Sequence, residues 1–143
     1  EEILENHIKA NPNENFSIAI GDIDFFKKVN DTYGHNCGDQ VLKSLSDLFK
    51  EKTLGMGHVC RWGGEEFLFF FPGINLDHAS TIMREINIAV SKSVITYKDL
   101  PLHVTMTFGV EENDFHSNIS EMVKRADDKL YYGKTHGRDT VIS

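Results

Sequence analysis

Residues 61–67 read RWGGEEF, two glycines and two glutamates set between apolar runs. The residues on either side, HVC at 58–60 and LFFF at 68–71, predict two strands, over about 58–62 and 66–71, joined by a tight turn. We expect the Gly-Gly pair to supply the positive φ that a tight hairpin demands. Glu65 and Glu66 would then stand at an open edge, where carboxylates can hold a cation. The alternative to a cation-binding turn is a solvated acidic turn without a ligand. A second acidic element in the sequence helps to choose between the two.

That second element lies in residues 16–24, which read FSIAIGDID. Apolar and small residues alternate here, which predicts a strand over about 16–22 that runs straight into Asp22. Carboxylates at a strand end, followed by a loop and a helix, put oxygen ligands at the mouth of a sheet, where Mg²⁺ and phosphates are usually bound. Lys27 adds a positive charge that can face a phosphate. An EF-hand is excluded, because Phe26 and Lys27 stand where that loop needs an oxygen ligand and a glycine.

The remaining pattern predicts an α+β fold, a split βαβ plan with helices on an antiparallel or mixed sheet. Asn118, with Glu121 three residues later, makes a capping pair for the last helix, and Asn75 caps another. The further predicted elements are helices over about 1–10 and 38–52, a helix after residue 75, a helix from 118 to 133, and strands over about 104–110 and 139–142.

Composition describes an ordinary globular chain of one domain, with 143 residues of which 40% are hydrophobic and 26% charged. The longest apolar stretch, residues 67–71, is far too short to span a bilayer, and no signal peptide is visible. Cys37 and Cys60 lack metal-ligand spacing, so we expect reduced, structural cysteines and a cytoplasmic domain without membrane contact.

Net charge is −7 and no basic stripe stands out, which argues against binding of nucleic acid through its phosphates. An acidic protein can still bind a polyanionic nucleotide when metal ions mediate. Each bound Mg²⁺ offsets two phosphate charges while carboxylates hold it. The acidic surplus therefore favours a metal–nucleotide ligand over a bare anion.

With these elements together, the chain resembles the GGDEF family of diguanylate cyclases, in the GGEEF spelling. The family pattern around the first strand, D-x-D-x-F-K-x-x-N-D-x-x-G-H-x-x-G-D, is matched from Asp22 to Asp39 with every spacing kept. The C-terminal pattern, A-D-x-x-L-Y-x-x-K-x-x-G-R, is matched from Ala126 to Arg138. The resemblance spans about residues 16 to 142 and implies a palm-like nucleotidyl-cyclase fold with a mostly antiparallel sheet.

The resemblance also implies a reaction, the Mg²⁺-dependent condensation of two GTP into cyclic di-GMP and two pyrophosphates, between two domains that face each other in a transient homodimer. Two Mg²⁺ (or Mn²⁺) would be bound in each active site with the substrate. The residues implied are Glu65, Glu66 and Asp22 for catalysis; Asp22, the Ile23 carbonyl and Glu65 for metal; Asn30 and Asp39 for guanine; and Lys27, Lys134, Arg138 and the N–H groups of Phe25 and Phe26 for phosphates.

Some roles stay open. Arg61 either steadies the hairpin or contacts phosphate, and Asp24 is either structural or in contact with metal. His35 and Trp62 are interpreted as structural. A catalytically silent module that binds GTP or cyclic di-GMP is the main alternative function, ahead of an ATP-specific cyclase and of an interaction module without a ligand.

Departures from the family pattern carry two further expectations. Leu54 and Gly57 stand where many members have an R-x-x-D inhibitory site, so we expect no product inhibition through that site. The D-x-L-T segment that usually precedes the first helix is missing from these residues. We therefore expect a domain excised from a larger sensor protein, whose full length can be membrane-anchored.

Overall fold

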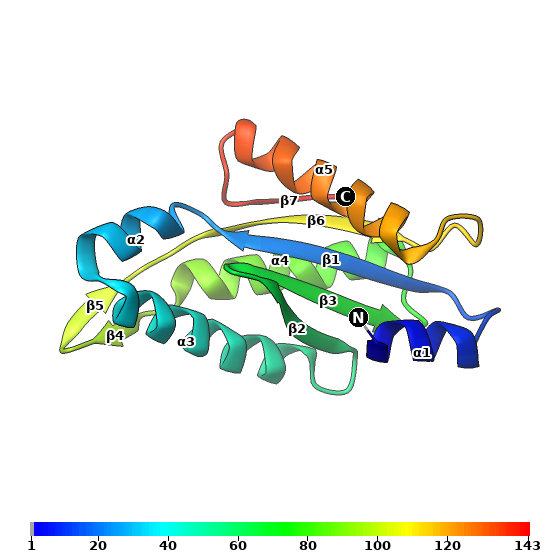
Figure 1. Ribbon diagram of the computed structural model, residues 1–143, viewed down its shortest axis with the longest axis horizontal. Coiled ribbons are helices and arrows are strands. Elements are labelled where there is room, and N and C mark those ends of the chain that lie inside the picture. Colours follow the sequence, from blue (N-terminus) through cyan, green and yellow to red (C-terminus); the bar gives the residue numbers. More distant parts are fainter. Residues whose placement is uncertain (1) are drawn as a thin grey trace.

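The computed structural model describes residues 2–143, which form one five-stranded sheet with helices on both faces and a separate two-stranded hairpin (Figure 1). The elements are α1 (Glu2–Ala10), β1 (Phe16–Ile23), α2 (Phe26–Tyr33), α3 (His35–Thr53), β2 (His58–Gly63), β3 (Glu66–Pro72), α4 (Leu76–Lys92), β4 (Ile95–Tyr97), β5 (Leu100–Leu102), β6 (Met106–Glu112), α5 (Ile119–Thr135) and β7 (Thr140–Ile142).

The main sheet has the order β2-β3-β1-β6-β7, with β1 at its centre. β1 pairs antiparallel with both β3 and β6, and only β7, among the strands described, pairs parallel. Helices cover both faces, so every residue of β1 is buried. The predicted α+β architecture with a mostly antiparallel sheet is confirmed.

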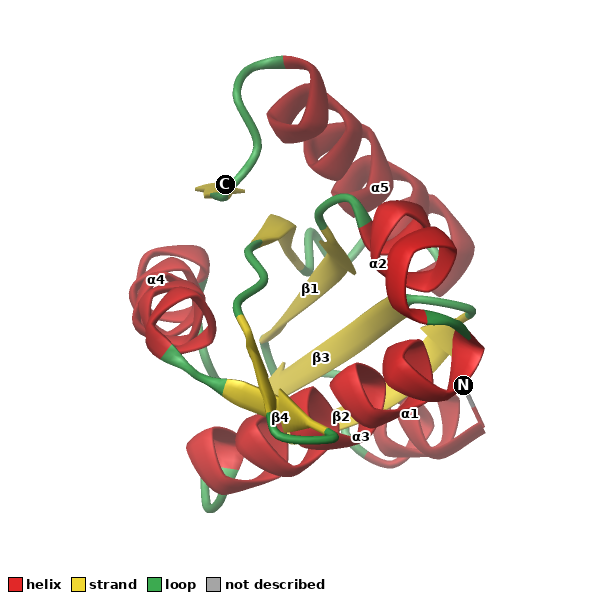
Figure 2. Cartoon of the chain, turned by 90° about the vertical axis from the view of Figure 1, so that its left-hand side faces the viewer, coloured by secondary structure: helices red, strands yellow, loops and turns green. Residues whose placement is uncertain are grey.

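Alternation along β3 divides the interior into two cores. Phe67, Phe69 and Phe71 face α3 and α4, whereas Leu68 and Phe70 face α1 and α5. Figure 2 shows the sheet end-on, with α3 and α4 on one side and α5 and α1 on the other. The two cores clamp the centre of the sheet, so the ends of β1 and β3 have fixed positions.

Both predicted helix caps are present. The Asn75 side chain accepts a hydrogen bond from the His78 N–H, and Asn118 forms a full capping box with Glu121. The cysteines are free, as predicted, but only Cys37 is buried. Cys60 is exposed on the edge strand β2, so the expected structural role is wrong for that residue. None of the helices in the described part of the chain is both long and apolar enough to cross a bilayer.

Three local predictions are wrong. The segment after β1, expected to be a loop, forms the helix α2, and the helix expected from 38 begins at His35. The β4–β5 hairpin was not foreseen, because its strands have three residues each and its turn residues, Lys98 and Asp99, take positive φ without a glycine. The strand expected from Val104 begins at Met106.

Candidate active site

Asp22 lies at the end of the central strand, opposite Glu66 of β3 and Thr107 of β6. Its side chain is buried, with 6% of the residue exposed. Oδ2 accepts a hydrogen bond from the Lys134 ammonium on α5, whereas Oδ1 is buried without a hydrogen-bond partner. A buried carboxylate oxygen without a partner is costly unless a ligand supplies one, so this strand end is suited to a cation.

The signature hairpin brings Glu65 to the same place. Gly63 pairs with Glu66, so Gly64 and Glu65 form the turn. The positive φ expected at the two glycines is wrong, because neither adopts it. A Cβ at either glycine would meet no heavy atom within 4 Å. Their absent side chains therefore leave the backbone of the turn open to the close approach of a ligand.

Arg61 steadies this turn. Its guanidinium donates a hydrogen bond to the Gly64 carbonyl oxygen at 2.6 Å, across a bulge in the pairing of β2 with β3. Of the two roles predicted for Arg61, the structure contains the one that supports the hairpin.

The carboxylates of this cluster repel one another. Partial burial, with the charge of Asp22 added to it, raises the pKa of Glu65 to about 7. Burial also raises the pKa of Glu66, and the charges of Asp127 and Asp22 add to that effect. Lys134 lowers both values but does not cancel the excess of negative charge.

This donor set fits a hard divalent cation such as Mg²⁺. The unpartnered Asp22 oxygen and the mutual repulsion of the acids are both relieved by positive charge, and carboxylate oxygens are the ligands that Mg²⁺ prefers. Ile23 lies one residue beyond the last pair of β1 with β3, so its backbone has no partner from that strand. No three acidic, His or Cys side chains among the described residues form a metal cage by themselves. A bound ion would need backbone, substrate or water oxygens as well.

Asp24 has a structural role. Its two carboxylate oxygens accept hydrogen bonds from the hydroxyls of Thr105 and Thr107, each at 2.7 Å, and from the backbone N–H of Asp139 at 3.0 Å. The side chain is buried and ties the end of β1 to β6 and to the segment before β7. Asp24 is therefore committed to these bonds.

The start of α2 forms the neighbouring wall. Phe25 adopts left-handed backbone geometry with φ 57°, and no side chain caps the helix, so N–H groups of the first turn are available to an anion. The Phe26 side chain is buried, whereas the Phe25 ring is exposed and lies under the Arg138 guanidinium at 4.5 Å. Arg138 is thus brought to the predicted amide cradle, and Lys27 is exposed on α2.

Asn30 on α2 and Asp39 on α3 lie on either side of the junction between these two helices. Asn30 Oδ1 is buried without a hydrogen-bond partner, and a Cβ at Gly38 would lie 1.9 Å from it. Asp39 follows Gly38 directly and is exposed. Asn30 therefore lies against the start of α3, which also carries Asp39.

One residue of the charge cluster was not assigned from the sequence. Asp127 on α5 acts on Glu66 strongly enough to be the leading charge that raises its pKa. It belongs to the quoted C-terminal pattern, but a pattern does not say which face of a helix meets which hairpin.

Comparison with known proteins agrees with this arrangement. The family model described as "Diguanylate cyclase, GGDEF domain" matches residues 1–140. The chain belongs to the GGDEF family. Its GGDEF relatives include the diguanylate cyclase DgcM of Escherichia coli K12, 36% identical over 91% of this chain, and the response regulator PleD of Caulobacter vibrioides, 38% identical over 88%. The chain spans 31% of the length of DgcM and 28% of that of PleD.

Solved structures share the fold. The GGDEF domain of DgcB from Caulobacter crescentus, in complex with c-di-GMP, is 28% identical with a TM-score of 0.91, over 99% of this chain and 85% of that one. The diguanylate cyclase SiaD of Pseudomonas aeruginosa, in complex with its activator SiaC, is 32% identical with a TM-score of 0.93, over 99% of this chain and 55% of that one. The palm-like nucleotidyl-cyclase fold is thereby established.

Proposed function

We propose that this domain condenses two GTP into cyclic di-GMP with release of two pyrophosphates. The observation that carries the proposal is the buried strand end at Asp22, whose unpartnered oxygen lies beside the Glu65 hairpin turn. The family and its relatives named diguanylate cyclases support the same chemistry. A purely structural cluster would not leave this oxygen without a partner.

Two Mg²⁺ (or Mn²⁺) ions per site complete the proposal, held by Asp22, the Ile23 carbonyl, Glu65 and phosphate oxygens. Bound there, Mg²⁺ lowers the pKa of a 3′-hydroxyl and neutralises charge on the triphosphate.

The protein groups divide the remaining work. With Mg²⁺ bound, Glu65 or its neighbour Glu66 on β3 would accept the proton of the attacking hydroxyl. The N–H groups at the start of α2 hold phosphate oxygens, together with Lys27, Lys134 and Arg138. Asn30 of α2 and Asp39 near the start of α3 form hydrogen bonds with the edge of guanine.

A single site of this kind binds one GTP, so the reaction requires two domains that face each other. Each domain presents its nucleotide's 3′-hydroxyl to the α-phosphate of the other, which makes catalysis a problem of proximity. We therefore expect the rate to rise faster than linearly with protein concentration. Fusion to a leucine zipper should raise specific activity by raising effective concentration.

The test is incubation of the protein with GTP and Mg²⁺, followed by chromatographic separation of the nucleotides. Cyclic di-GMP and pyrophosphate should accumulate with the wild type and with Glu51→Gln, an exposed change on α3 that serves as the matched control. Glu65→Gln should form no product. Turnover by Glu65→Gln at the wild-type rate would refute the assignment of the site.

Binding of GTP without product, at high protein concentration and with the zipper fusion, would refute the cyclase proposal. It would support the alternative of a nucleotide-binding regulatory module. Parallel incubation with ATP tests the base preference assigned to Asn30 and Asp39.

A further inference from the structure

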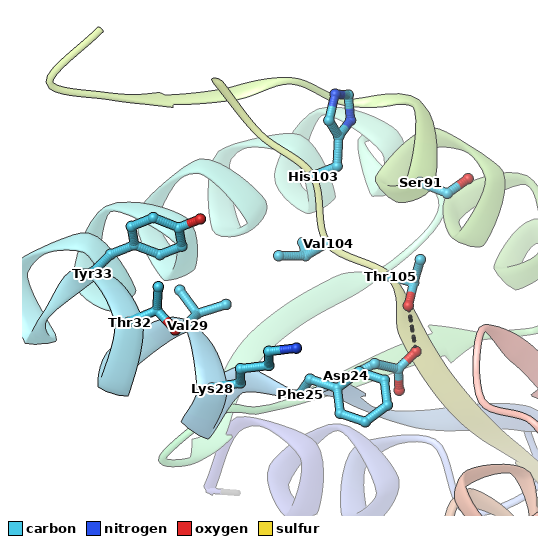
Figure 3. A pocket seen from close by; sticks show the side chains of 10 residues that line it. All are labelled: Asp24, Phe25, Lys28, Val29, Thr32, Tyr33, Ser91, His103, Val104 and Thr105. Atoms are coloured by element: carbon cyan, nitrogen blue, oxygen red, sulfur yellow. Dashed lines mark hydrogen bonds between the residues drawn. The ribbon is translucent and has the colours of Figure 1, made fainter. Parts of the chain in front are cut away.

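A pocket of about 330 Å³ opens between α2, the end of α4 and the segment that joins β5 to β6 (Figure 3). Its walls include Phe25, Lys28, Val29 and Tyr33 from the α2 region and His103 and Val104 from the joining segment. The size suits a small molecule. None of the six, apart from Phe25, has been given a role in the proposed reaction.

The helix α2 separates this pocket from the residues proposed to bind guanine. Lys28 and Thr32, and likewise Val29 and Tyr33, stand four residues apart and therefore share the face that lines the pocket. Asn30 stands two residues from Lys28, so its side chain projects from nearly the opposite side of the helix. It lies against Gly38 at the start of α3. The pocket is thus distinct from the place where guanine would bind.

The pocket carries a positive charge without a partner. The Lys28 ammonium extends toward the hollow in Figure 3, and it takes part in none of the hydrogen bonds or ion pairs found between residues 2 and 143. Asp24 is the one carboxylate among the lining residues, and its oxygens are already engaged by Thr105, Thr107 and the Asp139 N–H. Lys28 therefore lacks a ready counter-ion on the pocket wall.

The remaining lining combines apolar surface with polar tips. Val29 and Val104 form an apolar patch between the exposed rings of Phe25 and Tyr33. The Tyr33 hydroxyl and the His103 ring, like Lys28, have no hydrogen-bond partner within the described chain. A ligand that fits this pocket needs a flat apolar part to pack against the valines and aromatic rings. It also needs an anionic group to pair with Lys28.

We propose that this pocket binds a small aromatic anion, a carboxylate or a phosphate monoester carried on a single ring. The anionic group pairs with Lys28, and the ring packs against Val29 and Val104 between Phe25 and Tyr33. Phe25 lines this pocket, and its ring also lies under the Arg138 guanidinium. A bound ligand would therefore adjoin the proposed phosphate-binding residues.

The test uses phenyl phosphate as the probe, with the protein free of metal and nucleotide. Carbon-13 methyl spectra follow Val29 and Val104, which both line this pocket. Phenyl phosphate should shift both methyl signals saturably. Inorganic phosphate and benzyl alcohol, which each carry half of the recognised chemistry, should bind at least about tenfold more weakly.

Two neighbouring lysines provide a matched pair of variants. Lys28→Met should weaken phenyl phosphate binding about tenfold, because it removes the charge at similar volume. Lys27→Met, one residue away on another face of α2, should leave the affinity measured at the two valines unchanged.

The proposal is overturned if phenyl phosphate leaves both valine signals in place, or if Lys28→Met binds as tightly as the wild type. Loss of binding in Lys27→Met alone would place the probe at the phosphate cradle and would also overturn it. No GTP or Mg²⁺ enters the experiment, so its failure leaves the cyclase proposal standing, and an inactive cyclase would leave this pocket's test unaffected.

Discussion

Replacing Glu65 by glutamine should stabilise the metal-free protein above neutral pH. The pKa of Glu65 is raised from 4.5 to about 7, so the folded protein binds its proton more tightly than the unfolded chain does. Stability is therefore intact below pH 4.5, declines as the pH rises toward 7, and stays reduced above that. Because the side chain is only partly buried, we discount the full shift for solvent screening and expect a penalty of about 1 kcal/mol.

Glutamine removes this penalty, because its amide carries no charge beside Asp22 at any pH. In EDTA at pH 8, thermal unfolding of Glu65→Gln should occur about 3 °C above the wild type. At pH 4 the two proteins should unfold together. Glu51→Gln should track the wild type at both pH values. Equal melting temperatures at pH 8, or a difference that persists at pH 4, would refute the account of repulsion between Glu65 and Asp22.

Four further substitutions, of which Leu54→Arg is a control, test other parts of the structure. Asp24→Asn should lower the free energy of unfolding by about 3 kcal/mol in urea titrations, because the amide cannot accept from all its buried donors; an unchanged midpoint would contradict the structural role. Gly57→Asp should lower the free energy of unfolding by more than about 2 kcal/mol, because its Cβ would lie 2.2 Å from the carbonyl oxygen of Phe70. Leu54→Arg should change that free energy by no more than about 0.5 kcal/mol, because Leu54 is 84% exposed. Equal melting temperatures for these two variants would count against that packing. Gly38→Ala should weaken GTP binding about tenfold by calorimetry without loss of helicity, since its Cβ displaces the Asn30 amide; undiminished affinity would remove Asn30 from the guanine site.

Alternation in the sequence located β1 and most of β6, and the caps at Asn75 and Asn118 were correctly located. α2 was missed because it has eight residues, little apolar surface and no capping side chain. The positive φ predicted at Gly63 and Gly64 was wrong, because glycine also occurs where the backbone must stay accessible to a ligand.

The site residues were placed near one another by motif spacing, but their pairings were not. The ion pair of Lys134 with Asp22 joins residues 112 positions apart, and the bond from Asp139 to Asp24 joins residues 115 apart. Such contacts depend on how α5 and β7 pack on the sheet. The spacing of residues within a motif does not predict these long-range contacts. The structural role of Asp24 became visible only in its hydrogen bonds to Thr105, Thr107 and Asp139.

Because Lys134 already pairs with Asp22, metal binding at the end of β1 can involve the exchange of one cation for another. A cation that binds both oxygens of Asp22 would have to displace an ammonium that the chain holds in place by covalent connection. A monovalent ion gains little from that exchange, whereas a divalent ion brings twice the charge. Selectivity for divalent cations can thus come from a tethered competitor as well as from ligand geometry. A displaced Lys134 ammonium would be free to pair with a phosphate, so a single exchange would provide one cation for the carboxylates and another for the nucleotide.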